Sequence, residues 1–185
     1  MLILQGGQAL SSFRIQSLIS RANAAGIALE NLTCTYLFFA TGVVHDSAKL
    51  EQLLDASPLS VGSGLVALPR SGTTSPWSSK ATEIAKNCGF EIVKRIERGM
   101  HIVVEGQVSA ADQVLLNGLL ADPMMEDVLD GLPTEAFFTS GEPQPLGIVT
   151  LGVNPISALN EANQVHGLAL SDDEIDYLAH AYDKL

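Results

Sequence analysis

The feature that most constrains the fold of this chain is a strand that leads directly into a polar loop and then into a helix. Gly64–Leu68 is a short apolar run typical of a buried strand. Pro69–Phe90 follows, with many Ser and Thr residues, the only Trp, and helical spacing from Ser78 onward. Backbone N–H groups at a helix start are unpaired and partly positive, so such a junction suits an anion or a partner's carbonyl groups. It is also a common way to connect two elements.

Strands and helices alternate along the rest of the chain. The pattern predicts strands at Leu2–Gln5, Leu32–Ala40, Leu65–Leu68, Glu91–Glu97, His101–Glu105 and Ala136–Thr139. It predicts helices from Ser11 or Ser12 to Gly26, from Ser47 to a stop at Pro58, over Ser78–Cys88 with Gly89 as a cap, and over Ala110–Leu120. Ser75-Pro76 also fits a helix start, because proline suits the first helical position.

This order predicts an α+β domain with helices on one face of a mainly antiparallel sheet. Arg98-Gly99 is interpreted as the turn of a hairpin between the two strands on either side of it. A strand–helix–strand pattern occurs at residues 2–40 and again at 65–105, which suggests an internal duplication.

A change of composition predicts a boundary near residue 140. Ser140–Leu146 contains two prolines and no apolar periodicity, as linkers do, so residues 1–140 form one domain and 141–185 a linker with the start of a helical region. Two helices are expected there, one near Pro155–His166 and one starting at a capping box formed by Ser171 and Glu174.

The last predicted helix runs to Leu185 with no stop signal, so we expect the parent protein to continue beyond it. Ile175, Leu178 and Ala179 repeat on one face of this helix. We expect the isolated chain to expose apolar surface there, to bind hydrophobic dyes and to self-associate.

Charge and composition exclude several classes of function. A net charge of −11 repels phosphate backbones, so nucleic-acid binding is not expected, although basic residues cluster in the central segment. No apolar stretch approaches the roughly 20 residues needed to cross a bilayer. Met1–Gln8 lacks the features of a signal peptide, so a cytoplasmic protein is expected, with Cys34 and Cys88 as reduced core thiols.

None of the familiar catalytic or nucleotide-binding motifs is present with its residues at the required positions. Gly62-Ser63-Gly64 resembles a dinucleotide fingerprint, but these glycines precede the strand instead of following it. The chain has no P-loop pattern and no Cys-x-x-Cys pair, and Trp77 occupies the position where a Ser-x-x-Lys nucleophile would need its serine. The four histidines are scattered. We therefore assign no catalytic residue and no metal ligand to this chain.

The central residues do carry a resemblance. The run P-R-S-G-T-T-S-P-W-S-S-K-A-T-E-I-A-K-N-C-G-F, followed by R-I-E-R-G, resembles the N-terminal domain of the long, single-chain form of phosphoribosylformylglycinamidine synthase (FGAM synthase). Ala9-Leu10-Ser11 and Phe13-Arg14 near the start fit the same family. The tail G-L-A-L-S-D-D-E-I-D-Y-L at Gly167–Leu178 resembles the linker region before the catalytic core.

The resemblance implies a noncatalytic part of a glutamine-dependent ligase of purine biosynthesis. It implies a fold like a fused pair of the small subunits that other organisms make separately, which help to dock the glutaminase to the synthetase. ATP and magnesium would be bound by the parent enzyme and not by this chain, whose partners would be the synthetase and glutaminase domains. The chain alone would be inactive.

The polar loop is the expected contact edge with those domains and with the route of substrate or ammonia. Its predicted residues are Arg70, Thr73, Ser75, Trp77, Ser78, Ser79 and Lys80. The rival interpretation is that this loop only caps its own helix. The alternative for the whole chain is a free-standing α+β module that binds a small ligand or regulates another protein.

Overall fold

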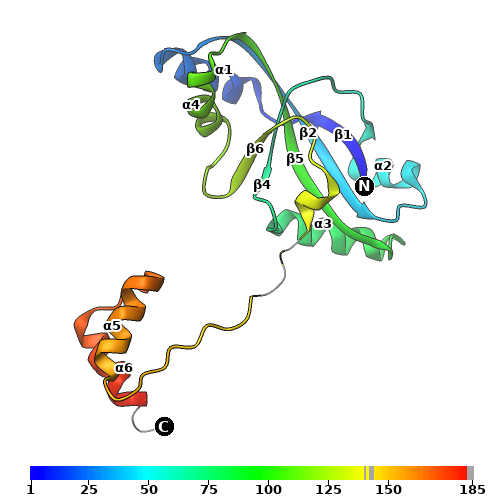
Figure 1. The fold of residues 1–185 in the computed structure, drawn as a ribbon. Helices are drawn as coiled ribbons and strands as arrows, with labels where there is room; N and C mark the ends of the chain where they lie inside the picture. Colours follow the sequence, from blue (N-terminus) through cyan, green and yellow to red (C-terminus); the bar gives the residue numbers. More distant parts are fainter. Residues whose placement is uncertain (140, 142–143, 183–185) are drawn as a thin grey trace. The chain divides into compact units, whose positions relative to one another are not determined.

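The computed structural model describes residues 1–139, 141 and 144–182 (Figure 1). The chain forms two compact units, Met1–Gly141 and Glu142–Leu185, which are treated separately below. Ser140, Glu142 and Pro143 of the expected linker, and the expected helix end at Leu185, lie outside the described residues. Within the described part, no helix is both long and apolar enough to cross a membrane.

The first unit is built on a six-stranded antiparallel sheet with the order β3-β1-β2-β5-β4-β6 (Figure 1). Its strands are β1 (Leu2–Gln8), β2 (Ala28–Gly42), β3 (Ser57–Pro58), β4 (Leu65–Pro69), β5 (Val93–Gln107) and β6 (Glu126–Asp130). β2 and β5 are the longest, at 15 residues each, and they pair along their whole length. The predicted antiparallel α+β class is confirmed.

The α-helices of this unit lie on one face of the sheet. They are α1 (Ser12–Ala24), α2 (Ser47–Leu54), α3 (Pro76–Asn87) and α4 (Ala110–Leu120). Side chains alternate along a strand, and Cys34, Phe38 and Ala40 of β2 all point to this face. Cys34 packs in a cluster with α1 and α4, whereas Phe38 and Ala40 pack with α2 and α3. Figure 1 shows α1 beside α4 at one end of the sheet.

The opposite face is covered in part by a short 3-10 helix, η1 (Glu135–Phe138), and Leu59 and Val61 also pack on this side. Leu37 and Phe39 of β2 point to this side and form a cluster with Val66, Leu68 and Phe138. The Phe39 and Phe138 rings are 5.3 Å apart. Both faces of the central strands are therefore buried, which explains why β2 and β4 contain nearly continuous apolar runs.

The two halves of the sheet repeat one another. Each contains strand, helix, long strand, helix and short strand in that order, and the sheet order is symmetric about the β2–β5 pair. Thr35 pairs with His101, and Tyr36 with Met100, near the middle of both long strands. This topology agrees with the duplication suggested by the sequence.

The predicted hairpin at Arg98-Gly99 is wrong, because β5 continues straight through these residues. Gly99 is needed for close packing and not for a turn. A Cβ atom built on Gly99 would lie 3.0 Å from the Ala67 carbonyl oxygen, 3.1 Å from the Phe39 ring and 3.2 Å from Leu68 Cβ. Only glycine leaves room for the neighbouring strand and the ring at this point.

The predicted last strand at Ala136–Thr139 is also wrong, because these residues lie in or next to η1. The true sixth strand is β6, in a segment whose acidic residues concealed it. Among the described residues, β6 pairs with β4 alone and so lies at an edge of the sheet. Charged side chains are common on edge strands, where they discourage pairing with another chain.

Most helix ends lie where the cap residues of the sequence predict them, but two predicted ends are wrong. α2 ends at Leu54, because the next residue, Asp55, adopts a left-handed conformation (φ 50°); it does not extend to Pro58, which lies in β3. α3 begins at Pro76 and not at Ser78, and Ser75 is its N-cap, which confirms the start suggested by Ser75-Pro76. Ser11 caps α1, and Gly89, at φ 95°, follows α3 as expected.

The second unit contains α5 (Pro155–His166) and α6 (Asp172–Tyr182). The predicted capping box is present: the Ser171 N–H donates to Glu174 Oε2 at 2.9 Å, and the Glu174 N–H donates to Ser171 Oγ at 3.4 Å. The Ser171 backbone N–H, followed by its hydroxyl, lowers the pKa of the Glu174 carboxyl.

The apolar face of α6 is not exposed, contrary to expectation. Ile175 and Ala179 are buried in a cluster with Leu159 of α5, and Leu178 packs against it. Other apolar side chains of this unit are exposed, among them Leu146, Ile148 and Val165, and Tyr177 and Tyr182 on α6 itself. The specific surface expected on α6 is therefore absent, and self-association stays a prediction.

The two thiols differ in environment. Cys34 is buried in the sheet, whereas Cys88 is exposed at the end of α3, so only Cys34 is the expected core thiol. Burial raises the pKa of the Cys34 thiol to about 11.

Substitution of Gly99 by Ala is expected to destabilise the first unit by about 1–3 kcal/mol, because the added methyl group overpacks the β4–β5 contact. Gly118 in α4 is the matched control, because nothing lies within 4 Å of a Cβ built there. Gly118→Ala should stabilise the protein by roughly 0.5–1 kcal/mol through helix propensity. Urea unfolding measures both changes. Equal effects from the two substitutions would contradict the packing role of Gly99.

At pH 8, a water-soluble disulfide reagent is expected to modify Cys88 quickly and Cys34 only after unfolding. The Cys34 thiol is buried and stays protonated at this pH, and the thiolate is the reactive form. Time courses of thiol release with and without denaturant measure this difference. In the control variant Cys88→Ser the fast phase should vanish, and a fast phase that persists would show that Cys34 is accessible.

Candidate functional site

The start of α3 is fixed by a hydrogen bond from inside the sheet. Ser75 Oγ accepts the Ser78 N–H at 3.0 Å, as an N-cap does, and donates its own proton to Glu97 Oε1 at 2.6 Å. The Ser75 N–H also donates to Glu97, at 3.2 Å. The carboxylate of β5 therefore holds the cap of the helix that follows the polar loop.

Glu97 is a buried carboxylate whose hydrogen-bonding capacity is used. Its side chain is 1% exposed and forms an ion pair of 2.6 Å with Arg95, whose side chain is 12% exposed. The Arg98 N–H donates to the same carboxylate at 3.0 Å. Burying an ion pair is costly unless it is well bonded, and removing one partner leaves an uncompensated charge.

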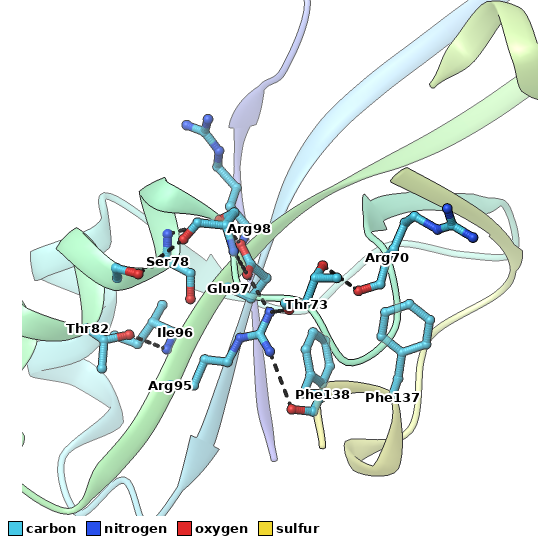
Figure 2. A network of polar contacts seen from close by, with 12 residues as sticks. Arg70, Thr73, Ser78, Thr82, Arg95, Ile96, Glu97, Arg98, Phe137 and Phe138 are labelled. Atoms are coloured by element: carbon cyan, nitrogen blue, oxygen red, sulfur yellow. Dashed lines mark hydrogen bonds and ion pairs between the residues drawn. The ribbon is translucent and has the colours of Figure 1, made fainter. Parts of the chain in front are cut away.

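Arg95 extends this network to the polar loop and to η1 (Figure 2). Its guanidinium donates to the Thr73 carbonyl at 2.6 Å and to the Phe138 carbonyl at 3.3 Å. It also lies 5.3 Å from the centre of the Phe138 ring. One arginine thus connects β5, the loop before α3 and the turn that covers the opposite face of the sheet.

The predicted site residues do not form one cluster of free polar groups. Thr73 Oγ1 donates to the Arg70 carbonyl at 2.7 Å, and Ser79 Oγ donates to the Ser75 carbonyl at 3.4 Å. Ser78 is fully buried, and its hydroxyl has no partner among the described residues. Among the hydroxyl groups of the predicted site residues, the one that caps α3 is that of Ser75.

The two predicted cations lie on the surface. Arg70 is 3.9 Å from Asp127 of β6, and Lys80 is 3.3 Å from Glu83 one turn along α3. Their side chains are 55% and 78% exposed. Arg70 and Lys80 therefore stay accessible to a partner, whereas Ser75 and Ser78 act inside the domain.

Trp77 packs against its own sheet and lines a pocket. Its ring stacks on Phe38 with centroids 5.7 Å apart, and the Arg98 guanidinium lies 4.9 Å from the Trp77 ring and 4.6 Å from Tyr36. This aromatic and arginine surface forms part of a pocket of about 390 Å³. Arg14 of α1 and Glu126 of β6 also line it.

Sequence reasoning missed Tyr36, Arg98 and Arg14 as neighbours of Trp77. The sequence pattern places Arg98 in a predicted turn, and Tyr36 within the predicted strand Leu32–Ala40 with no role of its own. The sequence did contain a pattern that could have revealed Arg98. Side chains alternate between the two faces along β5, and if Gly99 is taken as a strand residue, this alternation places Arg98 on the face that carries the helices. The register of β2 against β5, with Phe38 opposite Arg98, completes the assignment.

The described residues contain no group of three or more His, Cys, Asp or Glu side chains arranged to hold a metal ion. The sequence matches the family described as "Formylglycinamide ribonucleotide amidotransferase N-terminal" over residues 37–138. The chain belongs to this family. The match runs from β2 to the last residue of η1, so it includes the polar loop, α3 and the Arg95–Glu97 pair.

Membership in the formylglycinamide ribonucleotide amidotransferase family confirms the resemblance to the N-terminal domain of FGAM synthase. It makes the chain part of a larger amidotransferase of purine biosynthesis. The matched residues form the centre of the sheet and the surface around Trp77, whereas α1 and the second unit lie outside the match.

Substitution of Glu97 by Gln is expected to destabilise the first unit by about 3 kcal/mol or more, because the buried Arg95 charge loses its partner. Glu83→Gln is the control, since the exposed Lys80–Glu83 pair contributes at most about 1 kcal/mol. Thermal and urea unfolding measure both variants. A small effect at Glu97, similar to that at Glu83, would show that the network is not needed for stability.

Proposed function

We propose that this chain is the docking domain of an FGAM synthase. In this enzyme, ATP and glutamine drive the conversion of formylglycinamide ribonucleotide to its amidine in the cytoplasm. The domain supports the assembly of the glutaminase with the synthetase and borders the ammonia route between them. The observation that carries this proposal is the family match over residues 37–138, which include the polar loop, α3 and β5. ATP and magnesium bind to other domains of the enzyme.

The chemistry of the loop supports a binding role over a catalytic one. The hydroxyls of Thr73, Ser75 and Ser79 donate to backbone carbonyls or to Glu97. Glu97 already pairs with Arg95 and is buried, so it is unsuited to act as a general base. We therefore expect the isolated chain to hydrolyse no glutamine and to form no amidine.

The proposed contact edge consists of the accessible members of the loop and of the start of α3. The residues that meet the other domains are Arg70, Lys80 and the exposed part of Trp77. Ser75 and Ser78 do not meet them; the hydrogen bond from the Ser78 N–H to Ser75 Oγ fixes the start of α3. Aromatic and arginine side chains often dominate interface energies because they combine apolar area with directed hydrogen bonds. Arg70 and Lys80 carry positive charge in a chain of net charge −11. Each lies near a carboxylate of its own domain, but both side chains are exposed, so they can also pair with carboxylates of the facing domains.

Trp77→Ala and Lys80→Ala in the full-length enzyme test this edge. We expect glutamine-dependent turnover to fall several-fold, while turnover with added ammonia stays close to that of the unmodified enzyme, because the synthetase is intact and only docking is weakened. Lys86→Ala, in the last turn of the same helix, is the matched control. Steady-state rates with each nitrogen donor measure the effect.

Unchanged glutamine-dependent turnover in both variants, with only a lower melting temperature, would show that the loop merely caps its own helix. The free-standing module is the alternative for the chain as a whole. The intact mass of the natural gene product separates it from the docking domain, because a docking domain is covalently joined to the synthetase.

A further inference from the structure

The pocket beside Trp77 has a composition that the docking role does not explain. It lies on the helical face of the sheet, where residues from the first turns of α1 and α3 meet β5. Its volume of about 390 Å³ falls within the range of small-ligand sites, roughly 300–1,000 Å³. Apolar side chains such as Met100 and Leu120 form part of its lining, and its charged residues are Arg14, Glu97, Arg98 and Glu126.

Arg98 is held in place but keeps its hydrogen-bond donors free. Its guanidinium lies against the rings of Tyr36 and Trp77, at 4.6 and 4.9 Å. Among the described residues it forms no ion pair, and its side chain donates no hydrogen bond, because the neighbouring Glu97 is already paired with Arg95. Figure 2 shows the Arg98 side chain pointing away from the Glu97 network.

This arrangement prepares Arg98 for a ligand. Contact with two aromatic rings leaves the edge of the guanidinium available, and that edge can donate two parallel hydrogen bonds to a carboxylate or a phosphate. The rings also restrict the side chain before binding, so less conformational entropy is lost when a ligand arrives.

Arg14 supplies a second positive charge to the same pocket. It is exposed in the first turn of α1, and its side chain forms no ion pair with any described residue. The opposing charge is Glu126, whose Oε2 accepts the Asp122 N–H at 3.1 Å. With Glu97 neutralised by Arg95, two arginines face one carboxylate, so the pocket is locally cationic in an acidic protein.

We propose that this pocket binds a small organic anion through a phosphate or carboxylate group, with Arg98 as the main ligand-binding residue and Arg14 as the second. The apolar lining accommodates the carbon skeleton of the ligand. Glu126 opposes the anion and limits its affinity. This inference concerns the chain by itself and does not depend on the proposed docking function.

Calorimetric titration of the 185-residue chain with inorganic phosphate and with succinate, in a buffer free of other oxyanions, tests the proposal. We expect saturable binding of at least one probe, with a Kd of about 1 mM or below. Arg98→Gln should weaken binding at least about tenfold, and Arg98→Lys should weaken it less, because lysine keeps the charge but loses the bidentate geometry. Glu126→Gln should strengthen binding, since it removes the repulsion and keeps an oxygen for the Asp122 N–H.

Lys80→Gln is the control for general electrostatics, because it removes one positive charge from an exposed side chain that does not line the pocket. Should Arg98→Gln fail to fold, Arg14→Gln carries the test, since Arg14 is exposed on α1. Binding of phosphate alone, or of succinate alone, supports the site and identifies the head group. No saturable binding of either probe up to about 10 mM, or equal losses in the Lys80 and arginine variants, would overturn the proposal.

Discussion

The antiparallel pairing of β2 with β5 is the contact on which the rest of the molecule depends. It joins the two halves of the chain along 15 residues of each strand and forms the centre of the sheet. Because side chains alternate along both strands, this single register decides which residues face the helices and which face η1. A shift by one residue would exchange Phe38 with Phe39 and move Arg98 away from Tyr36 and Trp77.

The Arg95–Glu97 pair connects this sheet to the proposed contact edge. Glu97 holds the cap of α3, and Arg95 holds the carbonyl groups of Thr73 and Phe138. These contacts come from three separate segments, so the shape of the polar loop is determined by β5 and not by the loop sequence alone. The hydroxyl groups that made the loop conspicuous mostly serve this internal purpose, and the accessible chemistry lies in its cations and in Trp77.

The proposed contact edge and the proposed anion pocket occupy neighbouring surfaces. Trp77 belongs to both surfaces, because it follows the polar loop at the start of α3 and also lines the pocket together with Arg98. A ligand bound at Arg98 would lie beside the residues that we expect to meet the other domains. The family match covers Arg98, Tyr36 is just before its first residue, and Arg14 lies outside it, so the pocket combines matched and unmatched parts of the chain.

The sequence by itself determined the α+β class, the internal repeat, the capping of α1 and α6, and the family, because these follow from local periodicity, cap residues and a long specific motif. It misjudged Gly99, β6 and Ala136–Thr139. A glycine is equally compatible with a turn and with a strand position where a neighbouring strand packs closely, as at Gly99. The acidic residues of β6 hide the apolar pattern by which a strand is normally predicted. Only the tertiary structure decided that Glu97 is buried against Arg95 and that Arg14, Tyr36, Trp77 and Arg98 share a pocket. Those neighbours lie far apart in the chain, and strand register, which brings them together, is set by packing over the whole sheet.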